Sequence, residues 1–178
     1  PNRCFLLNGW NGLITHPPAF ARLMSLLHRG AAEAVMVEVV VTESAKMLAA
    51  KVGPDRVLLI RSGGDPHLAL AVAPEVLDKH PQAVSARFVE RFADPASFAK
   101  YRALAASERF APEAVAQRIA PEPGYADRLL RGIRDLAAKL ARPETVPINL
   151  PSVGLSQTKG AVSHCLWGSL LAMLGKYG

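Results

Sequence analysis

The sequence has few of the residues that build covalent, metal or aromatic frameworks. Its 178 residues include only two cysteines, Cys4 and Cys165, at opposite ends of the chain. This excludes a disulfide scaffold and favours a reducing compartment. Aromatic residues make up 6%, so stacking platforms for nucleic-acid bases are scarce. No apolar run reaches the length of a membrane-spanning helix, and we interpret the longest, Ala161 to Gly175, as a buried core helix.

Acidic residues are absent from the start of the chain. Glu33 is the first of them, whereas Arg3, Arg22 and Arg29 all precede it. A basic, acid-free amino terminus is typical of organelle-targeting segments. We therefore expect a mitochondrial location, with the cytoplasm as the alternative. The formal net charge of the whole chain is +6, which suits an acidic partner such as nucleic acid, an acidic protein face or anionic lipid.

Apolar residues form half of the sequence, which excludes a disordered chain and predicts a packed core. The length favours a single domain, or a short helical array, over residues 1–178. We expect residues 1–16 to be an amino-terminal extension. Residues 143–154 contain Pro143, Pro147, Pro151 and Gly154, and this density of breakers predicts an internal loop.

Helical patterns dominate the rest of the chain. Residues 125–141 place leucines and an isoleucine at helical spacing on one face, and Pro17-Pro18 precede an amphipathic segment that ends at Gly30. In the last segment, Leu166, Trp167, Leu170, Leu171 and Leu174 share one side of a helix. These patterns predict a mainly α fold of packed helical hairpins, similar to an α-solenoid.

An alternative α/β fold stays open. Residues 35–41 are rich in β-branched side chains, and 57–60 and 68–72 are short apolar runs. Such runs are compatible with strands as well as with buried helices. The alternative fold therefore contains a small sheet built from 35–41, 57–60 and 68–72.

Two segments resemble the octotricopeptide and pentatricopeptide-like helical repeats of organelles. One is Leu155-Ser156-Gln157 leading into the stretch from Leu166-Trp167 to Gly175, and the other is Pro17 to Gly30 followed by Ala31 to Val52. The resemblance implies a non-catalytic subunit or adaptor of a larger organellar assembly, such as a mitochondrial ribosome or an ATP synthase. Its partners would be other protein subunits.

Terminal repeats of such arrays need a cap, and the last helix has no polar one. Its outer face is therefore the predicted protein-binding surface, carried by Trp167, Leu170, Leu174 and Tyr177.

A second hypothesis is RNA binding by arginines at helical spacing, because arginine pairs with phosphate. The candidate contacts are Arg87, Arg91, Arg128, Arg131 and Arg142.

A third hypothesis is a small α/β enzyme or ligand-binding domain, with the Gly63-Gly64 turn as its ligand loop. The glycine pair lacks the further residues of a phosphate-binding motif. We find no catalytic constellation, no metal site and no cofactor motif: His164 and Cys165 are adjacent, so on a helix they point in different directions.

Overall fold

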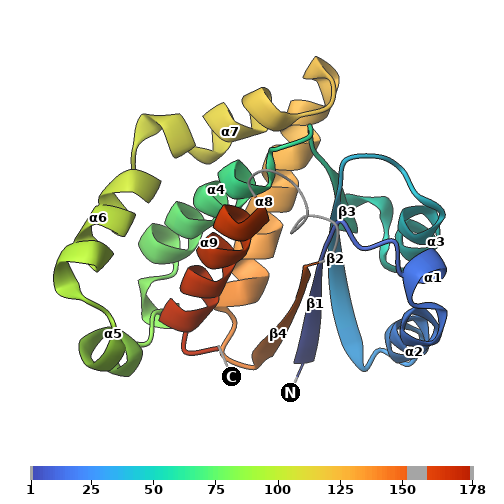
Figure 1. Ribbon diagram of the computed structural model, residues 1–178, viewed down its shortest axis with the longest axis horizontal. Helices are drawn as coiled ribbons and strands as arrows, with labels where there is room; N and C mark the ends of the chain where they lie inside the picture. The colour runs from blue at the N-terminus through green and yellow to red at the C-terminus, as the bar shows by residue number, and fades with distance from the viewer. Residues whose placement is uncertain (1, 152–159, 177–178) are drawn as a thin grey trace.

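The computed structural model describes residues 2–151 and 160–176. Its centre is a parallel sheet of four strands in the order β3-β2-β1-β4, where β1 is Asn2–Asn8, β2 Ala32–Glu38, β3 Val57–Leu59 and β4 Thr145–Pro151. The chain moves outward from β1 to β3 and then returns to place β4 on the other side of β1 (Figure 1). This is a doubly wound α/β topology, in which the strand order reverses between β1 and β4.

Successive strand residues face opposite sides of the sheet, which produces two separate cores. Leu6 of β1 packs in the larger core, and its neighbour Leu7 packs in the smaller one. On β2, Val37 belongs to the larger core and Met36 to the smaller one. Successive residues of these strands are therefore all apolar, because both faces of the sheet are covered.

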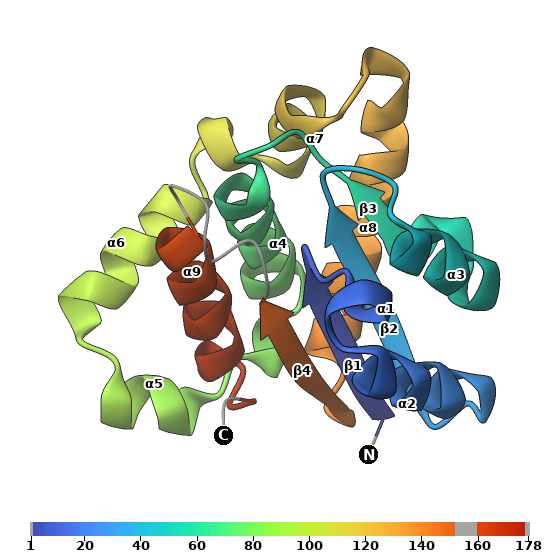
Figure 2. The ribbon, with the colours of Figure 1, turned by 45° about the vertical axis from the view of Figure 1, so that its right-hand side comes forward.

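The smaller core lies under α1 (Gly12–Thr15), α2 (Pro17–His28) and α3 (Glu43–Val52). Proline occupies the first turn of α2, where its fixed backbone favours helix initiation. The side chain of Thr42 caps α3 by accepting a hydrogen bond of 3.1 Å from the backbone N–H of Ala45. These local signals fix the connections from β1 to β2 and from β2 to β3 on one face (Figure 2).

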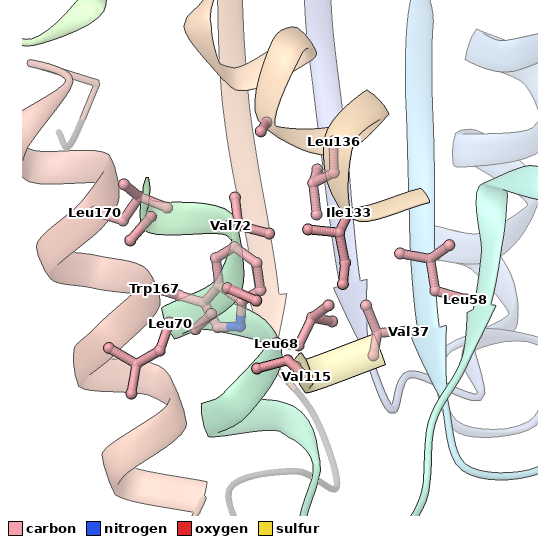
Figure 3. Packing of buried hydrophobic residues seen from close by; sticks show 14 of the residues in the cluster. Val37, Leu58, Leu68, Leu70, Val72, Val115, Ile133, Leu136, Trp167 and Leu170 are labelled. Carbon is pink, nitrogen blue, oxygen red and sulfur yellow. The ribbon is translucent and has the colours of Figure 1, made fainter. Parts of the chain in front are cut away.

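The larger core lies under α4 (Asp65–Lys79), α7 (Pro112–Ile119), α8 (Ala126–Ala141) and α9 (Gly160–Met173). Trp167 of α9 is 1% exposed and packs near α4 (Figure 3). Helix α8 approaches β3 so closely that a Cβ added at Gly132 would lie 2.2 Å from Leu58 Cδ2. A larger residue at this crossing would force the buried side chain of Leu58 to move.

Two further helices, α5 (Ala86–Phe92) and α6 (Pro95–Ala105), form an outer arm beside α4 and α9 (Figure 1). Helix α5 has no buried residue, and Ala105 is the buried residue of α6. Four short 3-10 turns complete the described elements, at Pro54–Arg56, Pro81–Ala83, Glu108–Phe110 and Pro123–Tyr125. The arm is thus held much less tightly than the layers against the sheet.

The chain is mainly helical, as predicted, but its helices flank a sheet and do not stack as hairpins. The alternative α/β prediction is confirmed for residues 57–60, which contain β3, and for most of 35–41, which overlap β2. It is wrong for 68–72, which lie inside α4. These residues are buried on almost every side, and a helix buried all round has no polar stripe to reveal its period.

Two segments expected to be irregular contain strands. The predicted extension 1–16 includes β1, a central strand, and the predicted loop 143–154 includes β4 up to Pro151. Strand β4 lies at the edge of the sheet, where proline is tolerated because one side of the strand has no partner to bond. Residues 152–154 lie outside the described residues.

Candidate ligand site at the carboxyl edge of the sheet

The carboxyl ends of the four strands meet along one edge of the sheet, because all the strands are parallel. In doubly wound folds, ligands bind outside this edge, at the point where the strand order reverses. Strand β1 ends there with Asn8 and β2 with Glu38, while β3 leads into the turn before Asp65. Polar side chains therefore gather where this topology places a ligand.

Asn8 and Asn149 mark the reversal itself. Asn149 of β4 pairs with Leu6 in the sheet register and shares its face with Asn8. The amide nitrogen Nδ2 of Asn8 donates a 2.8 Å hydrogen bond to Oδ1 of Asn149. Asn8 is only 5% exposed, yet its own Oδ1 has no hydrogen-bond partner within residues 2–151 and 160–176. Leaving a buried acceptor unpaired costs free energy, so this oxygen calls for a functional explanation.

Glu38 at the end of β2 is a second buried acceptor. The residue is 6% exposed, and its Oε1 has no hydrogen-bond partner in the part of the chain that the structure describes. The pKa of Glu38 is raised to about 7, mainly by burial and to a smaller extent by the charge of Asp65, while a hydrogen bond with the backbone of Val39 lowers it. The carboxyl group is therefore poised between its neutral and charged forms near neutral pH.

Asp65 begins α4 directly after the glycine turn. Burial raises the pKa of its carboxyl group, and a hydrogen bond with its own backbone lowers it. Neither Asp65 nor Glu38 forms an ion pair within the described parts of the chain. Two carboxyl groups thus share one edge of the sheet without a cation to balance them.

The hydrogen-bond donors around the Gly63-Gly64 turn have acceptors within the protein. Gly63 has a φ of 78°, a left-handed conformation that favours glycine. The N–H of Gly64 donates to the carbonyl of Arg61 at 2.9 Å, and Nε of Arg61 donates to the carbonyl of Ala120 at 2.7 Å. With these donors engaged and a carboxylate at the start of α4, the turn does not suit a phosphate.

Ser44 provides an internal comparison for the unpaired oxygens. It is fully buried, and its hydroxyl donates to Oδ1 of Asn11 at 2.7 Å while accepting from the N–H of Leu13 at 3.0 Å. This side chain ties α3 to the loop after β1 and has a structural role. Asn8 and Glu38 are buried to a similar extent but keep free acceptors, so fold stability alone does not explain them.

An apolar rim adjoins these polar groups. Directly after Glu38, the side chains of Val39, Val40 and Val41 are 36%, 63% and 54% exposed. Three exposed valines in a row are unusual next to a buried carboxyl group, because exposed apolar surface carries a solvation cost. The alternative prediction of a strand at 35–41 includes these valines, and the single acid within that apolar run was the available signal for Glu38.

The structure places the predicted protein-binding residues inside the chain. Trp167, Leu170 and Leu174 are buried in the larger core, and the faces they occupy pack against this protein's own helices (Figure 3). Tyr177 lies outside the described residues. The pattern of the last helix therefore reflects intramolecular packing in this fold.

The candidate RNA contacts fall into two groups on different parts of the molecule (Figure 1). Arg87 and Arg91 are exposed on α5. The others lie on α8 or just after it, where Arg128 pairs with Asp55 at 3.3 Å and Arg142 with Glu33 at 3.3 Å, while Arg131 is exposed. Two of the three arginines near α8 thus have acidic partners within the chain.

Neither cysteine joins a reactive centre in the described structure. Cys4 is buried in β1, and burial raises the pKa of its thiol to about 11, which makes it unreactive. Cys165 is exposed on α9. Within residues 2–151 and 160–176, no three histidine, cysteine or acidic side chains come together in a way that could hold a metal ion. No helix in these ranges is both long and apolar enough to cross a membrane.

Function must therefore be inferred from this geometry, because neither the models of known protein families nor the curated proteins give a match to the chain.

Proposed function

We propose that this protein is a ligand-binding α/β domain that holds a small polar molecule at the carboxyl edge of its sheet, beside the reversal between β1 and β4. The observation that carries the proposal is the pair of buried, unpartnered oxygens, Oδ1 of Asn8 and Oε1 of Glu38. Both lie at strand ends where doubly wound folds bind their ligands.

The chemistry of the edge limits the class of ligand. The free atoms are acceptors, so a ligand must present hydroxyl or N–H donors to them. Glu38 and Asp65 disfavour an anion, since a negative charge near two carboxyl groups is repelled. Val39 to Val41 offer an apolar surface for the rest of the molecule. The best match is a neutral or cationic molecule with several donors and one apolar face.

Matched pairs of small molecules test this proposal by calorimetric titration. We expect adenosine to bind more tightly than AMP, and ribose more tightly than ribose 5-phosphate, because each pair differs only in the phosphate. Glu38→Gln and Asn8→Leu should each weaken binding of the neutral member, whereas Ser62→Ala, on the exposed turn, serves as a control. Tighter binding of the phosphorylated member, or unchanged affinity in both edge variants, would contradict the proposal.

A further inference from the structure

A hollow between the outer arm and the last helix has the composition of a second binding site. Its volume is about 240 Å³. It is lined by residues from α5, α6, the link between them and the later turns of α9, namely Phe88, Ala93, Asp94, Ser97, Phe98, Tyr101, Ser169, Ala172 and Met173. Mostly apolar and aromatic walls with a few polar groups are typical of pockets for small molecules.

The arm is hydrogen-bonded to the end of α9, and the hollow lies between the arm and that helix. The backbone N–H of Ser85, which precedes α5, donates to the carbonyl of Met173 at 2.8 Å. Phe88 and Phe98 both line the hollow and are only partly buried, although Phe98 packs against the larger core. Large aromatic side chains are more often used to fill a core, so their position around a hollow indicates that something else completes the packing.

Tyr101 supplies a hydrogen-bond donor in this apolar setting. Its hydroxyl is shielded from solvent and has no partner in the described structure. Burial raises the pKa of Tyr101 to about 12, so the hydroxyl keeps its proton at neutral pH. A buried donor without an acceptor is costly, and a bound molecule with an acceptor oxygen would remove that cost.

Asp94 sets the charge that the hollow accepts. Its carboxylate caps α6 by accepting a 2.8 Å hydrogen bond from the N–H of Ser97, and this bond lowers the pKa of Asp94. The group is therefore negatively charged at neutral pH and repels an anion in the hollow.

We infer that the hollow between α5, α6 and α9 binds a small, neutral, largely apolar molecule whose carbonyl or ether oxygen accepts a hydrogen bond from Tyr101. A dry cavity of about 150 Å³ is enough for benzene, so this hollow admits a substituted aromatic ring or a compact aliphatic ketone. The residues of the sheet edge do not line it, and the inference is independent of the function proposed for that edge.

Acetophenone and α-methylstyrene form a suitable probe pair, because the alkene replaces the C=O group with C=CH2 at nearly the same size. Without a hydrogen bond the more apolar alkene should bind better. We expect the folded full chain to bind acetophenone about fivefold to tenfold more tightly than the alkene, in line with one net hydrogen bond. Ligand-observed NMR titration measures both affinities.

Two kinds of variant separate the parts of the site. Tyr101→Phe keeps the ring, and should reverse the preference in favour of the alkene. Ala172→Leu fills the hollow from α9 and should abolish binding of both probes. Ser169→Leu fills it from an exposed position and replaces the first variant if that variant folds poorly. Val162→Ala changes an exposed apolar side chain of α9 outside the lining and is the control.

Charge provides a separate readout. Benzoate should bind more weakly than acetophenone, and Asp94→Asn, which retains the capping ability of the residue, should reduce this difference. The inference is overturned by failure of both neutral probes to bind at millimolar concentration. It is equally overturned by a preference for acetophenone that persists in Tyr101→Phe, or by binding that survives in a folded cavity-filling variant.

Discussion

The buried carboxyl group of Glu38 makes stability depend on pH in a definite direction. Burial raises its pKa from an ordinary 4.5 to about 7, so the folded chain holds this proton more tightly than the unfolded chain does. The contribution of Glu38 to stability is therefore largest in acid. It declines as the pH rises from about 4.5 to 7 and stays at its lowest above that range.

Glu38→Gln removes this dependence while keeping the size of the side chain. At pH 5 the buried Glu38 is mostly protonated, and the glutamine variant should differ little from the parent. At pH 8 the parent carries a buried charge, so the variant should be more stable. The advantage of the variant should grow by about 2 kcal/mol between pH 5 and pH 8, which corresponds to roughly 4–8 °C in the melting temperature of a chain of this size.

Urea unfolding at several pH values measures the effect, with Trp10 and Trp167 as buried fluorescent reporters on opposite faces of the sheet. Glu90→Gln, on the exposed surface of α5, is the control and should show no such growth. A Glu38→Gln variant that is less stable at pH 8, or whose advantage does not change with pH, would mean that the carboxylate has a stabilising partner. The proposed ligand site would then rest on Asn8 alone.

Three other substitutions test which buried side chains stabilise the fold and which serve binding. Asn8→Leu should leave the free energy of unfolding unchanged or raise it by about 1 kcal/mol, because the lost bond to Asn149 is offset by relief of the unpaired oxygen. Ser44→Ala should instead lower it by about 1–3 kcal/mol, since two hydrogen bonds of a buried hydroxyl are lost; equal losses in these two variants would contradict the distinction. Trp167→Ala should lower the free energy of unfolding by roughly 3–5 kcal/mol, because the side chain is buried in the core. Unchanged melting would instead mean that Trp167 contacts a partner.

Local patterns were sufficient where an element carries its own signal. The amphipathic stripe of α8 could be identified from neighbouring residues alone, whereas the β-branched run of β2 was compatible with both a strand and a buried helix. Helix α4 could not be identified in this way, because burial on all sides removed its stripe, and the helix continues through Pro74. Its packing against the sheet, α7, α8 and α9 offsets the hydrogen bond that the proline cannot donate.

The central strand was harder to predict because its partners are distant in sequence. In β1, Leu6 pairs with Val35 on one side and with Asn149 on the other, and no local pattern shows such pairing. The candidate site depends on the same long-range register, since Asn8 and Asn149 meet only when β4 returns beside β1. The glycine turn was visible in the sequence, but its donors serve the chain itself, which only coordinates could show.

Other buried charged side chains in this protein have partners of opposite charge, and this contrast supports a ligand site at the carboxyl ends of the strands. Near the opposite edge, where β2 begins, the almost fully buried Lys139 lies 2.5 Å from Glu33 and 4.0 Å from Asp135. In α4, the buried carboxylate of Glu75 pairs with Lys79 at 2.7 Å. This fold therefore supplies partners for the buried charges that its stability requires. Glu38, buried as deeply as Glu75, has no ion-pair partner among the described residues, and this is the arrangement that the proposed ligand site requires.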